Sequence, residues 1–246
     1  MTGTVYALVG TVGGAGATRL SLEFAATLAR AGRNVCVVDA AFGTQGLATA
    51  VPGEVGTDVT DAVTEERPLA EATTSLGLDV PGRVAVAPAR ASFEQLARAK
   101  TSACARRLAE RLSAAAERYD AVIADVPPVA ANPSVAAVTA ADRVALVAPD
   151  SARGVDSLPR TRDLLADVDA RVDAVVANFA DPDDRHLREA DAAVPESETT
   201  ALSGAPVSVA PEPFPTAVTD AVETVAGVDL DLAEPEQSSL SDSLPL

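Results

Sequence analysis

Three glycines, Gly13, Gly14 and Gly16, stand close together in the segment T-V-G-G-A-G-A-T-R. Of all residues in the chain, their type and spacing indicate a chemical role most clearly. Because glycine has no Cβ atom, the backbone can adopt positive φ there and turn its N–H groups inward on an anion. An apolar run at 5–9 precedes the glycines, and an amphipathic helical pattern at about 18–31 follows them. The start of that helix adds free N–H groups and the positive end of its dipole. The segment therefore predicts a phosphate-binding loop, with close strand–helix packing as the other interpretation.

Three polar side chains, Asp39, Asp125 and Asn178, each follow a short apolar run that is typical of a buried strand. Ligands of open α/β sheets bind at the carboxyl ends of the strands, so these side chains are candidates for the same site as the glycine loop. Aspartate is also common at turns, and simple strand-end caps stay open as the alternative.

The glycine segment resembles the deviant Walker A motif, K-G-G-x-G-K-T-T, of the MinD/ParA family of P-loop ATPases. Four residues match the motif: Gly13, Gly14, Gly16 and Thr18. Val12 stands at the position of the family's signature lysine, Ala17 at that of the ordinary P-loop lysine, and Arg19 at that of the second threonine. The resemblance implies a main-chain phosphate cradle without the two lysines that accompany it in the family.

Further segments resemble the same family in order along residues 4–226. Asp39 resembles the first aspartate of the family's D-x-D segment. In this chain Ala41 stands at the position of the second aspartate. Asp125 begins D-V-P-P, which resembles the Walker B and switch II motif D-x-P. Asn178 stands at the position of the asparagine that contacts adenine, although Phe179 replaces the basic residue expected next. The segment P-V-S-V-A-P at 206–211 resembles the last strand and the base-side loop.

The resemblance implies a ligand, ATP or ADP with Mg²⁺, and a set of residues that would hold it. The implied nucleotide-binding residues are Gly13, Gly14, Ala15, Gly16, Ala17, Thr18, Arg19, Asn178 and Pro211. The implied metal-binding residues are Thr18, Asp39 and Asp125, and Asp39 is also the single candidate for a catalytic residue. A nucleotide-dependent homodimer and an unidentified protein partner are implied as well.

Three functions are compatible with these residues. The leading hypothesis is a MinD/ParA-like regulatory or positioning protein that binds a nucleotide and hydrolyses it weakly or not at all. The second is an active ATPase in which Arg19 replaces the missing cation, although a neighbouring helical position points about 100° away from Ala17. The third is a dinucleotide-binding oxidoreductase, in which Gly10, Gly13 and Gly16 form the glycine pattern and Asp39 binds a ribose.

Composition limits the classes of partner. The 36 acidic and 19 basic residues give a formal net charge of −17, and Lys100 is the only lysine. Acidic residues spread along the whole chain indicate a surface suited to high salt, and no basic stripe predicts nucleic-acid binding. The chain starts directly in its first predicted strand, and no apolar run approaches the roughly 20 residues of a membrane helix. These features predict a cytoplasmic protein without a membrane helix.

Apolar runs alternating with helical patterns predict one α/β domain at 1–227, with a largely parallel seven-stranded sheet covered by helices on both faces. Strands are predicted at 4–9, 34–39, 84–88, 121–125, 143–148, 174–178 and 206–209. Helices are predicted at 18–31, 57–63, 93–118, 132–140, 157–167, 183–191 and 215–226. Residues 228–246 are acidic and polar, and we expect a disordered tail there.

Overall fold

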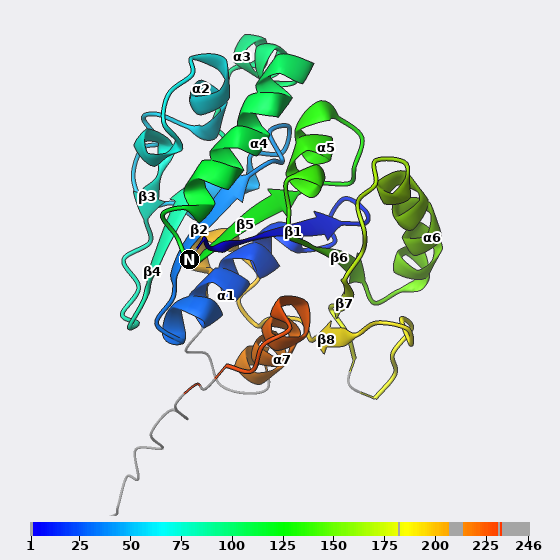
Figure 1. The fold of residues 1–246 in the computed structure, drawn as a ribbon. Coiled ribbons are helices and arrows are strands. Elements are labelled where there is room, and N and C mark those ends of the chain that lie inside the picture. Colours follow the sequence, from blue (N-terminus) through cyan, green and yellow to red (C-terminus); the bar gives the residue numbers. More distant parts are fainter. Residues whose placement is uncertain (1, 182, 207–213, 231, 233–246) are drawn as a thin grey trace, which may run out of the picture.

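The structure is a computed structural model that describes residues 2–181, 183–206, 214–230 and 232 (Figure 1). Within these ranges eight strands form one sheet in the order β3-β4-β2-β5-β1-β6-β7-β8. The strands are β1 (Thr4–Gly10), β2 (Asn34–Asp39), β3 (Thr74–Ser75), β4 (Arg83–Ala87), β5 (Ala121–Val126), β6 (Arg143–Pro149), β7 (Ala174–Asn178) and β8 (Ala192–Val194). All neighbouring strands are parallel except β3 and β4.

Helices cover both faces of the sheet (Figure 1). They are α1 (Ala17–Arg30), α2 (Val59–Thr64), α3 (Phe93–Ala99), α4 (Ser102–Ala116), α5 (Asn132–Thr139), α6 (Ala152–Ala166) and α7 (Phe214–Ala226). Three 3₁₀ turns accompany them: η1 (Gly46–Thr49), η2 (Leu69–Ala72) and η3 (Leu202–Gly204). The predicted α/β class with a helix-covered, mostly parallel sheet is confirmed.

The central strand β1 shows why the sheet needs both helical layers. Val5, Ala7 and Val9 pack into the cluster that includes α4, α5 and α6. Leu8 packs into the other cluster, with α1 and α7. Side chains alternate between the faces of a strand, and every position of β1 from Ala7 onward is buried. A strand buried on both faces is a continuous apolar run, as the sequence predicts.

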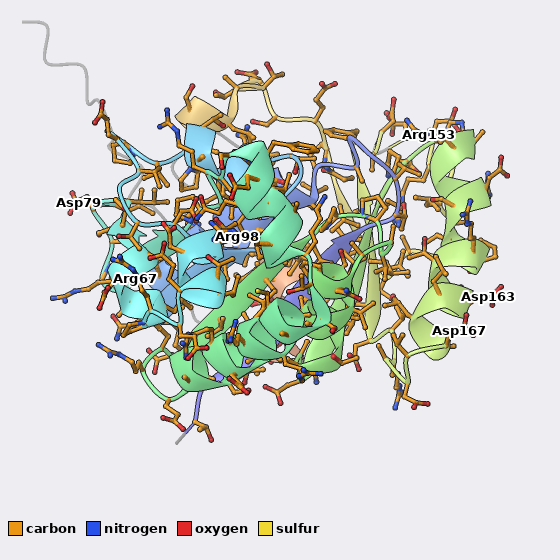
Figure 2. The ribbon with its side chains drawn as sticks, turned by 90° about the horizontal axis from the view of Figure 1, so that it is seen from above. Arg67, Asp79, Arg98, Arg153, Asp163 and Asp167 are labelled. Atoms are coloured by element: carbon orange, nitrogen blue, oxygen red, sulfur yellow. The ribbon has the colours of Figure 1, made fainter. Side chains whose placement is uncertain are left out.

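Helix α6 has one face against the sheet and one face toward solvent. Figure 2 shows Arg153 near its start and Asp163 and Asp167 near its end, with their side chains directed outward. Leu158 and Leu165 of the same helix are buried in the core. The division of apolar and charged side chains between two faces explains how α6 covers one end of the sheet while adding to the acidic surface.

Some predicted elements differ from the structure, and one lies outside the part of the chain that the structure describes. The sheet has eight strands in the described residues and not seven, because β3 and β8 are too short to produce an apolar run. The predicted strand at 206–209 lies outside the described residues except for Pro206. The predicted helix at 93–118 is two helices, because Thr101 accepts a hydrogen bond from Cys104 N–H and starts a new one.

The predicted helix at 183–191 is also wrong, since the segment is a loop that leads into β8. Asp150 accepts a hydrogen bond from the N–H of Leu187, which a helix would use internally. Most of the predicted tail lies outside the described residues, which end with 228–230 and 232. None of the helices in the described ranges has the length and apolar character that crossing a bilayer requires.

Candidate functional site

A cavity of about 510 Å³ opens at the carboxyl ends of the central strands. The glycine loop and the start of α1 form its floor, together with Asp125 and Asn178. The rest of the lining comes from the segments that follow β2, β5, β7 and β8, and from Phe214 at the start of α7. The predicted loop and two of the three predicted strand-end residues therefore lie around one space, at the sheet edge where open α/β proteins bind ligands.

The glycine loop has the backbone conformation that an anion cradle needs. Gly14 and Gly16 have φ of 81° and 86°, in the left-handed region that favours glycine. The loop is closed by a hydrogen bond from Ala15 N–H to the carbonyl of Val12. Toward the other described residues, the N–H groups of Gly13, Gly14, Gly16, Ala17 and Thr18 donate no hydrogen bond. These five donors remain available for oxygen atoms of a ligand.

Asn178 holds the loop in this conformation. Its Nδ2 donates a 2.9 Å hydrogen bond to the carbonyl of Ala15, and its side chain is buried. A Cβ atom on Gly16 would lie 2.1 Å from the same Nδ2. Only glycine therefore fits at position 16, and β7 is tied directly to the loop. The sequence did not predict this contact, which gives Asn178 a positioning role independent of any contact with a base.

Two buried carboxyl groups lie beside the loop. Asp39 and Asp125 are neighbours in the register of β2 and β5, and Asp125 forms a hydrogen bond with the Thr18 hydroxyl. Asp39 accepts hydrogen bonds from the N–H groups of Ala41 at 2.8 Å and Ala89 at 3.2 Å. Asp125 Oδ2 is buried without a partner among the described residues.

Burial governs the ionisation of this pair. It raises the pKa of Asp39 to about 8, aided by the charge of Asp125, although the two backbone N–H groups oppose the shift. Burial likewise raises the pKa of Asp125 to about 7, against the hydrogen bond from Thr18. Two adjacent buried carboxyl groups with pKa values near neutrality hold a proton between them unless a cation compensates their charge.

Arg19 does not reach the cradle. Its Nε lies 2.6 Å from the buried Glu23 Oε1, and its Nη2 donates to Ser197 Oγ at 3.0 Å. Its guanidinium also lies over the ring of Phe214, 5.8 Å from the centroid. The charge of Arg19 is therefore paired with Glu23 at the α7 side of the cavity, away from the free N–H groups of the loop.

The two lysine positions of the motif are occupied by apolar side chains. Ala17 is buried in the cavity wall, and Val12 packs partly against the core. Lys100 lies outside this cavity, with its Nζ 3.7 Å from the point that a Cβ on Gly43 would occupy. In the described part of the chain, no lysine or arginine other than Arg19 lines the cavity.

Comparison with known proteins agrees with this geometry. A family model described as an AAA domain matches residues 3–173. The chain belongs to this family. A comparison with curated protein sequences found no match.

Solved structures share the fold of this AAA-domain protein at low identity. MinD from Pyrococcus horikoshii OT3, complexed with Mg-ADP, superimposes with a TM-score of 0.77 and 19% identity, covering 90% of this chain and 95% of that chain. McdA from Cyanothece, complexed with ATP, gives 0.75 and 20%, covering 93% and 98%. A ParA family ATPase from Chlorobium tepidum TLS gives 0.74 and 19%, covering 90% and 98%. The predicted MinD/ParA-like P-loop fold is confirmed.

The donor set suits a magnesium ion, which the fold family implies. An unpartnered buried carboxylate oxygen of Asp125 lies in the same cluster as the Thr18 hydroxyl and Asp39. Among the described residues, no three histidine, cysteine or acidic side chains gather as a complete metal cage. Magnesium is commonly held by one or two carboxylates, with substrate phosphates and water completing its shell. The residues present therefore fit the ion in company with a phosphate ligand.

We expect the metal-free protein to lose stability as pH rises from about 4 to about 8. The folded state keeps protons on Asp39 and Asp125 up to about pH 8 and 7, whereas ordinary aspartates lose them near 3.8. The folded state thus binds more protons in this window, so rising pH favours unfolding. Urea unfolding in EDTA at constant ionic strength and at several pH values measures the slope of the free energy of unfolding against pH.

Asp125→Asn is the matched variant for this measurement. The amide keeps the shape of the carboxyl and removes its charge, so the slope should become much shallower and stability at pH 8 should rise. Equal slopes in the two proteins would contradict the assignment of the pH dependence to this pair.

Other parts of the site were not predicted from the sequence. Pro195, Glu196, Ser197, Thr199 and Thr200 line the cavity from the segment after β8. Polar loop residues without a motif carry no signal of such a role, because their place depends on how β8 pairs with β7. The predicted base-side residue Pro211 lies outside the described residues.

Proposed function

We propose that this AAA-domain protein binds ATP or ADP with Mg²⁺, hydrolyses it slowly or not at all, and acts as a regulatory or positioning protein. One observation carries the proposal: the main-chain cradle and the adjacent Thr18–Asp125 pair are kept, while no cationic side chain of the described residues is directed into the cradle. The proposal is supported by the fold shared with a MinD that contains Mg-ADP and a McdA that contains ATP.

In this proposal the phosphates would accept hydrogen bonds from the N–H groups of Gly13, Gly14, Gly16, Ala17 and Thr18. Thr18 and Asp125 would hold the ion, and Asp39, the register partner of Asp125, would add a second carboxyl group beside it. Mg²⁺ supplies positive charge to the phosphate oxygens and to the carboxyl pair when bound. Arg19, with Glu23 and Phe214, closes the wall of the cavity and does not replace a lysine. Asn178 keeps the loop open through Ala15.

The missing cations explain why turnover should be slow. Phosphoryl transfer depends on positive groups that stabilise charge on the transferred phosphoryl, and the chain's own side chains offer none at positions 12 and 17. Losing one positioned stabiliser of this type costs about 3–4 kcal/mol, or roughly a hundredfold to a thousandfold in rate. The main-chain donors still bind and orient the ground-state phosphates.

We expect phosphate release from ATP to be at least about a hundredfold slower than in an ATPase of this fold that has both lysines. The measurement is release of inorganic phosphate in multimolar KCl, because we also propose that the acidic surface is adapted to a high-salt cytoplasm. Asp125→Ala is the control for contaminating activity. Turnover at ordinary ATPase rates that Asp125→Ala abolishes would show that another group has replaced the lysines.

Binding is tested separately by titrating ATP, ADP, GTP and NAD(H) into the protein with Mg²⁺. Adenine nucleotides should bind, and NAD(H) should not. Asp39 is fully buried and both its oxygens accept backbone N–H groups, so it does not offer the ribose contact that a dinucleotide site needs. Binding of NAD(H) without binding of ATP would replace the proposal.

We further propose a nucleotide-dependent homodimer and a protein partner. A solved complex of MinC with MinD from Aquifex aeolicus has a chain of this fold at 20% identity and a TM-score of 0.73. Two copies that each carry a net charge of −17 repel one another, so association should strengthen as salt screens the surfaces. Sedimentation with ATP and without it, at low and high KCl, distinguishes a dimer that needs nucleotide from one that needs only salt.

A further inference from the structure

A second cavity, of about 240 Å³, lies between η2 and α4, and it shares no lining residue with the first. Its lining residues are Glu66, Pro68, Leu69, Ala70, Thr73, Arg111, Ala114, Ala115, Arg118 and Tyr119. The proposed function uses none of them. The cavity therefore needs its own explanation.

Two arginines give this cavity a positive charge in an otherwise acidic protein. Arg111 and Arg118 both line it, and neither forms an ion pair with another described residue. The only acidic lining residue, Glu66, is already paired with Arg107. The lining thus carries two guanidinium groups that no carboxylate of the described chain compensates.

Arg111 also has an unsatisfied donor. Its Nε is buried and has no hydrogen-bond partner among the described residues. A buried donor of a charged group that stays unpaired has lost its hydration without compensation, which destabilises the folded chain. Arg107, four residues earlier on α4, satisfies its own guanidinium with Glu66 and the carbonyl of Val63. Arg107 thus has acceptors within the chain, whereas Nε of Arg111 has none among the described residues. This difference indicates that an acceptor from outside the chain would satisfy Arg111.

The rest of the lining is apolar apart from the hydroxyl groups of Thr73 and Tyr119. Leu69 is buried, and Pro68, Ala114 and Ala115 add aliphatic surface. Tyr119 forms a side-chain hydrogen bond with Thr73, and burial raises the pKa of its phenol, which keeps it a neutral donor. An inorganic anion would form ion pairs with the arginines but leave the apolar part of the lining exposed to water. A ligand with an anionic head and a short apolar body matches both halves.

We propose that this cavity binds a small organic carboxylate, with its head on Arg111 and Arg118 and its apolar body against Leu69 and Ala115. A guanidinium offers paired N–H donors that match the two oxygens of a carboxylate. The volume lies below the 300–1,000 Å³ of drug-sized ligands, so a single ring or short branched chain is the expected size. This site is independent of the proposed nucleotide site, and either can fail alone.

The experiment titrates benzoate into the full chain by calorimetry at fixed ionic strength, with benzyl alcohol as the neutral probe of similar shape. Benzoate should bind at millimolar concentration, and benzyl alcohol should bind at least tenfold more weakly. Arg111→Gln should weaken benzoate at least tenfold. Arg106→Gln is the matched control, because Arg106 is an exposed arginine of the same helix that does not line the cavity.

Unchanged unfolding midpoints and an unchanged ATP titration would show that Arg111→Gln leaves the fold intact. If that variant is unstable, Arg118→Gln, which removes the other guanidinium of the lining at an exposed position, should still weaken benzoate several-fold. The proposal is overturned if benzoate does not bind the native protein or if benzyl alcohol binds equally well. Equal losses in Arg111→Gln and Arg106→Gln would also overturn it, because they indicate a general effect of charge.

Discussion

Replacing Ala17 by lysine is expected to raise the affinity for ATP at least tenfold, or about 1.4 kcal/mol. Ala17 is the first residue of α1 and lies in the wall of the large cavity, next to the free N–H groups of the loop. A lysine there adds a cation close to the phosphates without changing the backbone of Gly14 or Gly16. Calorimetric titration of ATP and ADP with Mg²⁺ measures the change, which should be larger for ATP because it carries more charge.

Two further variants separate the contributions in this experiment. Thr18→Ala in the Ala17→Lys protein should remove much of the Mg²⁺-dependent part of the affinity, since Thr18 contacts Asp125. Val12→Lys should leave the affinity of the monomer nearly unchanged and act on nucleotide-dependent association. If Ala17→Lys binds ATP no better than the native chain, the loop is not a P-loop that lacks only its cation.

Gly16→Ala is expected to destabilise the fold by about 2–5 kcal/mol, one of the largest effects of any single methyl group in this chain. The first cause is backbone strain, because residue 16 has φ of 86°. The second is overlap, because the new methyl would lie 2.1 Å from Nδ2 of Asn178, which is buried and bonded to Ala15. Urea unfolding at constant pH gives the difference in the free energy of unfolding.

Gly13→Ala is the matched control for that measurement. Gly13 has no positive φ, and nothing lies within 4 Å of a Cβ built on it, so its substitution should cost no more than about 0.5 kcal/mol. In an Asn178→Ala background, Gly16→Ala should cost distinctly less, because the 2.1 Å overlap is gone and only the strain and a 3.1 Å contact with Cζ of Phe179 remain. Equal losses of unfolding free energy at positions 13 and 16 would refute the close contact between Asn178 of β7 and the glycine loop.

The parts of the fold that the sequence predicts well are those with a local signal. The strands that carry Asp39, Asp125 and Asn178 are buried on both faces and form continuous apolar runs. Thr101 shows where local signals mislead, because the apolar pattern continues through 93–118 while a capping hydroxyl divides it into α3 and α4. The short strand β8 has no pattern of its own and depends on pairing with β7.

The same distinction applies to the candidate site. Glycines before a helix and aspartates after strands have a local meaning, so the sequence predicted that they belong together. The pairing of Arg19 with Glu23 is an i,i+4 contact that helical spacing alone allows. The contact of Arg19 with Ser197, 178 residues away, cannot be predicted from helical spacing. Asn178 is the clearest case, since its type was noticed and its partner, the carbonyl of Ala15, lies 163 residues earlier.

The hydrogen bond between Asn178 and Ala15 has a consequence for ligand binding. In many nucleotide-binding proteins the phosphate orders a neighbouring switch segment, and a partner detects that change in conformation. Here the chain itself sets the shape, so a ligand has little ordering entropy to lose on entering and little conformational change to cause in the loop. We therefore expect any partner that distinguishes the loaded from the empty protein to detect the ligand's own charge at the mouth of the cavity.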